Sequence, residues 1–385
     1  MFGVGFELGD NRCMTKASQI HCIQKIQKAL RQRKLPAALI SKPENVRYLC
    51  GYTGTNGRLL ITPKQATLIT DFRYIRSARK QIPKRVGIYD QKKGAELKNL
   101  LVKFKTLGIE EGTITHAQFL ALKKLLPKCR LKPISGLVEE LRMVKSLDEI
   151  RIIKKAVKMA DEAFRCLVAS IRLGESEKDL AWRLASIAHD LGADGFSFPP
   201  IIAFGKNSAD VHHEPNDRRL KKGDMILIDM GLKYKGYCTD MTRTIFTHKP
   251  NKIEQKIYSI VLDANQSAIK AIKSGLKAAD VDHVARGIIE KAGYGQHFGH
   301  ALGHGVGLEM HEAPNINPPS PKRLRRAGEK SEVILKPGMM FTIEPGIYLD
   351  RVGGVRLEDM VYVNEKGQVE VLTKANKKIQ TIFTK

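Results

Sequence analysis

Apolar and polar residues alternate along the first third of the chain in a pattern that predicts short helices and strands in turn. Residues 20–33 carry apolar side chains near helical spacing. Short apolar runs between turn residues predict buried strands at residues 37–40, 59–61, 66–70, 86–88 and 107–109. Two further helical patterns cover residues 97–105 and 117–126. We therefore expect a smaller N-terminal α/β domain over residues 1–136.

The pattern changes after residue 136 and predicts a second, larger domain over residues 137–385. A long helical stretch covers residues 136–172, and the sequence from Ser146 to Glu149 is typical of a capping box. Further helices are predicted at residues 177–191, 253–274 and 278–292, with strands in residues 225–246 and towards the C-terminus. Helices and strands that are grouped in this way favour an α+β fold class.

Two carboxylates interrupt the strand-rich middle of this domain. Asp229 ends the apolar run that begins at Met225, and Asp240 follows eleven residues later. A turn at Tyr234 and Lys235 would place the two carboxylates directly opposite in an antiparallel hairpin, roughly 5 Å apart at Cβ. Two like charges so close together repel each other and need a counter-charge.

A second pair of carboxylates lies near the C-terminus. Glu344 and Glu358 are equally far from Arg351, which lies in a glycine-containing turn. An unbulged hairpin about that turn again places two carboxylates opposite each other. Two divalent cations would neutralise the four acidic groups of the two pairs.

A glycine-rich segment supplies a candidate imidazole ligand. His300 and His304 have the spacing of a helical zinc pair, but Gly303 and Gly305 make a helix improbable and the glutamate of an HExxH motif is missing. Carboxylates with one imidazole suit manganese, cobalt, iron or zinc better than a thiolate site would.

These segments closely resemble the "pita-bread" metallopeptidases, the family of aminopeptidase P and prolidase. The resemblance rests on the sequences around Asp229, Asp240, His304, Glu344 and Glu358 and extends over nearly the whole chain. Further matching segments cover residues 52–57, 70–74, 139–146 and 311–312. The resemblance implies a C-terminal pita-bread domain, a creatinase-like N-terminal domain, a homodimer, and hydrolysis of the bond between an N-terminal residue and a following proline.

The same resemblance assigns roles to individual residues. It implies five metal ligands for two divalent ions, most simply manganese, with Asp240 and Glu358 bridging: Asp229, Asp240, His304, Glu344 and Glu358. It also implies that His212 matches a family histidine and that His311 contacts the reacting carbonyl or the substrate. We expect Glu344 to move a proton to the leaving prolyl nitrogen, and His212 and His311 to donate to developing negative charge. Arg356 shares a strand face with Glu358 and is expected to orient a ligand carboxylate, to bind a substrate carboxylate, or to form a structural salt bridge.

Two departures from the family pattern affect this assignment. Val211 stands where the family has proline, so that either His212 or His213 could point into the site. Residues 322–332 have the character of a basic surface insertion.

Several functions remain open on the sequence. An Xaa-Pro aminopeptidase is the first expectation and an Xaa-Pro dipeptidase the alternative. A methionine aminopeptidase fits the N-terminal domain less well. A non-catalytic protein that binds peptide or nucleic acid through the same fold has no need for four mutually repelling carboxylates.

Composition limits the partners and the compartment. The net charge of +26 favours non-specific contact with polyanions, but the short basic runs lie outside any nucleic-acid-binding motif, so no specific nucleic acid is expected. No apolar stretch is long enough for a membrane span. Six scattered cysteines and the lack of a signal-like start favour reduced thiols and a cytoplasmic location.

Overall fold

The computed structural model describes residues 14–91, 94–318 and 332–382, and the side chains of residues 94–96 lie outside the description. The chain forms two compact units, which separate in sequence between Arg142 and Met143, a few residues after the boundary expected from the sequence. The expected insertion at residues 322–332 lies outside the described residues except for Glu332. No described helix has the length and apolar character that a membrane crossing requires.

The first unit is a six-stranded mixed sheet in the order β4-β3-β2-β1-β5-β6. Its strands are β1 (Ala38–Ile40), β2 (Arg58–Ile61), β3 (Ala66–Thr70), β4 (Val86–Asp90), β5 (Thr106–Ile109) and β6 (Arg130–Pro133). Its helices are α1 (Lys16–Gln32), α2 (Pro43–Cys50), α3 (Phe72–Gln81), α4 (Gly94–Leu101), α5 (His116–Leu125) and α6 (Glu139–Met143). The predicted alternation of helices and strands in this region is confirmed.

Alternate residues of the central strands of this sheet face opposite layers. Ala37 and Leu39 belong to an apolar cluster with Leu101 of α4 and Leu122 of α5. This follows from the two-residue period of a strand, which sends successive side chains to opposite faces. The cluster gives the first unit a hydrophobic core of its own.

The sequence predicts one continuous helical stretch over residues 136–172, where the two units join in sequence. The structure instead ends α6 at Met143 and begins α7 (Leu147–Ser170) after the capping box of Ser146 and Glu149. The break has a physical cause, because Val144 forms a β-bridge with Met339 and Lys145 donates a backbone hydrogen bond to Gly338. The predicted cap is confirmed, whereas the predicted continuity is wrong.

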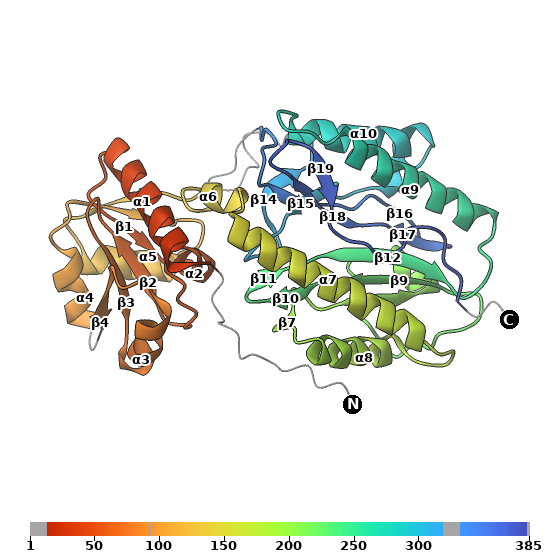
Figure 1. Cartoon of the computed structure of the whole chain (residues 1–385), viewed down its shortest axis with the longest axis horizontal. Coiled ribbons are helices and arrows are strands. Elements are labelled where there is room, and N and C mark those ends of the chain that lie inside the picture. Colours follow the sequence, from red (N-terminus) through yellow and green to blue (C-terminus); the bar gives the residue numbers. More distant parts are fainter. Residues whose placement is uncertain (1–13, 92–93, 319–331, 383–385) are drawn as a thin grey trace. The chain divides into compact units, whose positions relative to one another are not determined.

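Two pairs of helices cover opposite sides of the strands in the second unit, as Figure 1 shows. One pair is α7 with α8 (Glu177–Asp190), and the other is α9 (Lys252–Ala271) with α10 (Ala278–Lys291). The first pair covers β7 (Gly195–Phe196), β8 (Ile201–Phe204), β9 (Met225–Met230), β10 (Leu232–Tyr234), β11 (Tyr237–Cys238) and β12 (Met241–Phe246). The second pair covers β13 (Gly303–Gly305), β14 (Glu312–Ile316), β15 (Met340–Ile343), β16 (Gly346–Leu349), β17 (Gly353–Arg356), β18 (Asp359–Val363) and β19 (Val369–Val371).

Two short 3-10 helices complete the second unit, at Gly205–Ala209 and Gly295–His297. The strands form separate small sheets, among them β12-β9-β8 and β14-β13-β15-β18-β19. The two halves meet where β12 contacts β17 and β18. At this seam Glu358 donates its backbone N–H to the carbonyl of Thr242, at 3.1 Å.

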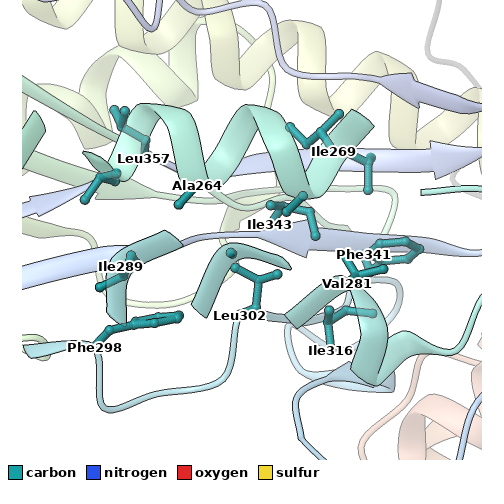
Figure 2. Close-up of a cluster of buried hydrophobic side chains, with 14 of the residues drawn as sticks. Ala264, Ile269, Val281, Ile289, Phe298, Leu302, Ile316, Phe341, Ile343 and Leu357 are labelled. Atoms are coloured by element: carbon teal, nitrogen blue, oxygen red, sulfur yellow. The ribbon is translucent and has the colours of Figure 1, made fainter. Parts of the chain in front are cut away.

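The apolar cluster beneath α9 and α10 fixes the side chains on the seam (Figure 2). Ile343 and Leu357 are fully buried in this cluster, and each immediately precedes a glutamate. Because successive residues of extended chain point to opposite faces, burying Ile343 and Leu357 against the helices turns Glu344 and Glu358 away from them. The hydrophobic core thereby directs two charged side chains to one place.

We expect that Ile289→Ala in α10 will lower the free energy of unfolding by about 2–5 kcal/mol, because it removes a fully buried side chain and leaves a cavity. Chemical denaturation followed by circular dichroism measures this change. The matched control is Trp182→Ala on α8, where the side chain is 77% exposed and a change within about 0.5 kcal/mol is expected. Equal losses in the two variants would contradict the assignment of the core.

Candidate metal centre

The first carboxylate pair lies on a hairpin whose turn differs from the predicted one. Met230 pairs with Met241 and Asp229 pairs with Thr242, so Asp229 does not lie directly opposite Asp240 as the sequence predicted. The turn residues are Lys235 and Gly236, with φ of 48° and 79°. Both residues at the centre of such a two-residue turn need positive φ, and a glycine meets this requirement at no steric cost. The pairing register differs by two residues from the predicted one, and a shift of two residues keeps Asp240 on the same face of the hairpin as Asp229.

The second carboxylate pair has the predicted register. Ile343 pairs with Asp359 on one side, and Gly346 pairs with Arg356 on the other. Glu344 and Glu358 lie between these two pairs in a continuous register, which confirms the predicted hairpin alignment.

His304 lies on strand β13 and not on a helix, as the neighbouring glycines predict. The register with β14 shifts between His304 and Gly305, a β-bulge of the kind that re-aims a side chain. Gly303 permits a close approach to β15, because a Cβ atom there would lie 2.0 Å from the carbonyl oxygen of Thr342. No larger residue fits at this position beside the imidazole.

Three ligand atoms of one cluster come from different parts of the second unit. Single donor atoms of Asp240, His304 and Glu358 all lie within 4.8 Å of one another. Glu344 Oε1 is 3.4 Å from His304 Nε2, and Asp240 Oδ2 is 3.5 Å from the same nitrogen. The structure therefore brings together side chains that lie more than a hundred residues apart in the sequence.

Asp229 belongs to the same electrostatic cluster. Its charge is among the causes that raise the pKa values of Asp240, Glu344 and Glu358, after burial as the first cause. The pKa of Glu344 rises to about 8, and those of the other two carboxyls rise well above their ordinary values. Burial and mutual repulsion both disfavour the charged carboxylates, so the site as built requires a compensating positive charge.

Two of the carboxylates keep one oxygen without a hydrogen-bond partner. Asp229 accepts from Arg356 at Oδ2, at 2.6 Å, while its buried Oδ1 has no partner. Glu358 accepts from the hydroxyl of Thr242 at Oε2, at 2.7 Å, while its buried Oε1 has no partner. An orphaned buried carboxylate oxygen is costly, and a bound cation satisfies it. The donor set present here thus fits divalent metal ions.

The imidazole of His304 is oriented and neutral, as a metal ligand needs to be. His304 Nδ1 donates to the carbonyl of Gly305 at 3.1 Å, which leaves the Nε2 lone pair facing Asp240 and Glu344. Burial, followed by the charge of His311, lowers the pKa of His304 to about 3. A neutral imidazole whose other nitrogen is held by a hydrogen bond is the form that binds a metal.

Arg356 is buried and uses all three guanidinium nitrogens inside the protein. Nη2 donates to Asp229, Nη1 to the hydroxyl of Tyr348 at 2.9 Å, and Nε to Thr242 at 3.2 Å. Of the roles considered from the sequence, these contacts favour the orientation of a ligand carboxylate.

The two histidines after Val211 have different surroundings. His213 is buried and its Nε2 lies 2.7 Å from Glu177, which also accepts hydrogen bonds from the backbone of Phe204 and Asn216. His213 therefore anchors its loop. His212 is exposed, and its charge is among the causes that lower the pKa of His300 to about 4, after burial. Of the two, His212 therefore stays the predicted site residue.

The rings at the rim of the site pack against one another. His311 is exposed and its ring centroid lies 4.1 Å from that of His304. The next residue, Glu312, forms a buried ion pair with Lys145 at 2.7 Å, which ties the segment after β13 to the start of the domain. The position of His311 thus depends on a contact made far away in the sequence.

Three residues near the site were not predicted as site residues from the sequence: His300, Tyr348 and Asn265. His300 Nε2 accepts from Tyr348 at 2.9 Å, and Tyr348 in turn accepts from Arg356. The predicted hairpin register could have revealed Tyr348, because Tyr348 pairs with Gly354 and is therefore a diagonal neighbour of Arg356. Asn265 on α9 gave no sequence signal, since it lies within an ordinary amphipathic helix.

Asn265 holds the two glutamate-bearing segments to α9. Its side-chain amide donates to the carbonyls of Ile343 and Leu357, at 3.0 and 3.2 Å. We expect Asn265→Ala to cost about 2–4 kcal/mol of unfolding free energy, because two buried carbonyls lose their partner. Urea denaturation measures the loss, and Gln266→Ala on the exposed side of the same helix serves as the control. A loss no larger than that of the control would contradict this bridging role.

Comparisons with known proteins agree with this geometry. The model of metallopeptidase family M24 matches residues 151–365, and that of the creatinase/prolidase N-terminal domain matches residues 23–144. The Xaa-Pro dipeptidase of Pyrococcus furiosus is 36% identical, over 93% of this chain and 99% of that protein.

Solved structures of similar proteins cover almost the whole chain. The Xaa-Pro dipeptidase from Bacillus anthracis has a TM-score of 0.87 at 36% identity, over 94% of this chain and 100% of that chain. The X-Pro aminopeptidase from Thermotoga maritima has a TM-score of 0.81 at 34% identity, over 92% of this chain and 100% of that chain. The expected α+β pita-bread fold with a creatinase-like N-terminal domain is confirmed. The chain belongs to metallopeptidase family M24 and is a peptide-bond hydrolase.

Proposed function

We propose that this chain is an Xaa-Pro dipeptidase that works with two divalent metal ions. In this proposal manganese is the first candidate, and cobalt, iron and zinc are alternatives. The ligands are Asp229, Asp240, His304, Glu344 and Glu358. The observation that carries the metal assignment is the pair of buried, unpartnered oxygens of Asp229 and Glu358 beside a neutral imidazole.

The relatives favour a dipeptidase over the aminopeptidase that the sequence placed first. Proteins named Xaa-Pro dipeptidase match this chain at 36% identity over nearly its full length. The aminopeptidase from Thermotoga maritima follows closely at 34% identity. We therefore reverse the order expected from the sequence and keep the aminopeptidase as the second candidate.

Proline imposes a particular requirement on the reaction. The Xaa-Pro bond is a tertiary amide without an N–H, so the enzyme cannot recognise the leaving residue through that donor. Two bound divalent ions would supply Lewis acidity, which lowers the pKa of water and stabilises negative charge on the carbonyl oxygen. The departing prolyl nitrogen must then receive a proton, because it is too basic to leave as an anion.

Glu344 is the carboxylate best placed to move that proton. Its side chain is 17% exposed, whereas that of Asp240 is 5% exposed, so Glu344 lies nearer the open side of the site. It can take a proton from the attacking water at a carboxylate oxygen and deliver it to the prolyl nitrogen.

His212 and His311 complete the proposed catalytic set. Both are exposed, and His311 packs edge to face against His304. From these positions they can donate hydrogen bonds to the carbonyl oxygen as negative charge develops on it. Arg356 contacts Asp229 and Tyr348 and thereby holds Asp229, one of the proposed metal ligands, in place. A homodimer and a cytoplasmic location stay predictions.

The length of the preferred substrate tests the choice between the two activities. We expect kcat/KM to be at least about tenfold higher for Xaa-Pro dipeptides than for Xaa-Pro-Yaa tripeptides, because a dipeptidase binds the terminal carboxylate of proline. Hydrolysis followed by amine detection measures both rates under the same metal conditions. Faster cleavage of the tripeptides would replace the dipeptidase by the aminopeptidase.

The effect of Mn²⁺ on the stability of a ligand variant tests the assignment of the metal ligands. In metal-free protein, Glu358→Gln should leave the free energy of unfolding unchanged or raise it by about 1–3 kcal/mol, because it removes a buried, repelled charge. With saturating Mn²⁺ the same variant should be less stable than the parent chain, because binding to the native state stabilises it. Thermal unfolding with and without chelator measures both effects.

The exposed Glu140 provides the matched control for that comparison. Glu140→Gln makes the same chemical change away from the metal centre and should respond to manganese as the parent chain does. Destabilisation by Glu358→Gln that is equal with and without metal would argue against Glu358 as a ligand.

A further inference from the structure

The positive charge of this protein is concentrated in its first unit. Residues 1–142 contain 28 lysines and arginines against 10 aspartates and glutamates, a net charge of +18. The remaining residues 143–385 contain 38 against 30, a net charge of +8. The peptidase site lies wholly in the second unit, so the proposed reaction does not account for this asymmetry.

Several acidic residues of the first unit accept hydrogen bonds inside it. Glu110 is 2% exposed and accepts from the backbone N–H groups of Ser41 and Lys42. Glu111 accepts from the backbone of residues 134 and 135, and Glu139 from Gly136. These carboxylates satisfy backbone donors and offset little of the charge at the surface.

Helix α3 and the turn after it carry a dense group of exposed cations. The group consists of Arg76, Arg79, Lys80, Lys84 and Arg85, which we call the α3 patch. The first three lie on one face of the helix, because residues three and four apart are neighbours there. None of the five has an ion-pair partner among the residues that the structure describes. Arg73 is different, because Asp71 accepts two hydrogen bonds from its guanidinium.

An aromatic side chain stands beside these cations. Phe72, the first residue of α3, is 76% exposed and lies on the same helix face as Arg76 and Arg79. An exposed phenylalanine is costly in water, but it offers a flat surface on which an unpaired base can stack. Three of the five patch cations are arginines, whose planar guanidinium groups suit phosphate and base recognition.

We propose that the α3 patch with Phe72 binds single-stranded nucleic acid without regard to its sequence. The cations contact successive phosphates, and the ring of Phe72 stacks on one base. An anionic membrane fits less well, because an interfacial helix buries a broad apolar face whereas Phe72 is the single large apolar side chain exposed on the described part of α3.

Fluorescence anisotropy with a labelled 20-nucleotide oligothymidine tests this proposal on the full-length protein. We expect a dissociation constant in the micromolar range at about 150 mM salt. If about four phosphates are contacted, the slope of log K against log salt is about −3, so that a fourfold rise in salt weakens binding roughly 60-fold. The variant Arg76→Glu/Arg79→Glu/Lys80→Glu should weaken binding by about 100-fold or more.

A matched variant separates the patch from the overall charge. Lys123→Glu/Lys124→Glu/Lys128→Glu changes three exposed lysines on and just after α5, with the same change in net charge. It should weaken binding less than about fivefold. An equal loss in both triple variants would overturn the proposal, because net charge alone would then explain the affinity. Far-UV circular dichroism and thermal unfolding verify that each variant is folded.

Two further measurements test the nature of the ligand. Phe72→Ala should weaken oligothymidine binding about tenfold and should have no effect on an abasic oligomer of the same length, because stacking is lost only in the first. A 20-base-pair duplex should bind more weakly than the single strand. Tighter binding to the duplex, or patch-dependent binding to phosphatidylserine vesicles without binding to oligothymidine, would overturn the proposal.

Discussion

The mutual repulsion of four acidic side chains is the constraint on which the second unit depends. Asp240, Glu344 and Glu358 all have raised pKa values, which arise first from burial and then from the charges of neighbouring carboxylates, with Asp229 among them in each case. His304 is the adjoining imidazole. Asp229 lies on β9 and Asp240 directly precedes β12, in the half covered by α7 and α8, whereas Glu344 directly follows β15 and Glu358 directly precedes β18, in the half covered by α9 and α10. A cation bound between them would therefore join the two halves of the unit and remove the repulsion at their seam.

At this seam the two oxygens of a carboxylate have different surroundings. In Asp229 and Glu358 one oxygen accepts from a protein donor, and the other is buried without a partner. The donors are themselves held, because Arg356 also contacts Tyr348 and Asn265 fixes the backbone before Glu344 and Glu358. Such orientation lowers the cost of ordering the ligands when a metal binds.

The sequence predicts those parts of the site that depend on local periodicity. The register of the second hairpin follows from the symmetric placement of Glu344 and Glu358 about their turn, and the glycines around His304 correctly exclude a helix. The predicted turn of the first hairpin is wrong by one residue, because Lys235 adopts a positive φ that is uncommon for lysine. Asn265 and the break after α6 depend on distant partners, which periodicity along the chain does not encode.

Anomalous diffraction tests the metal centre most directly, on a crystal of this protein grown with Mn²⁺ and with data collected near the manganese absorption edge. We expect two anomalous peaks between the two halves of the second unit, in contact with Asp240 and Glu358 and enclosed by the other three ligands. A crystal without a peak at this place, or with the four carboxylates turned away from one another, would contradict this expectation.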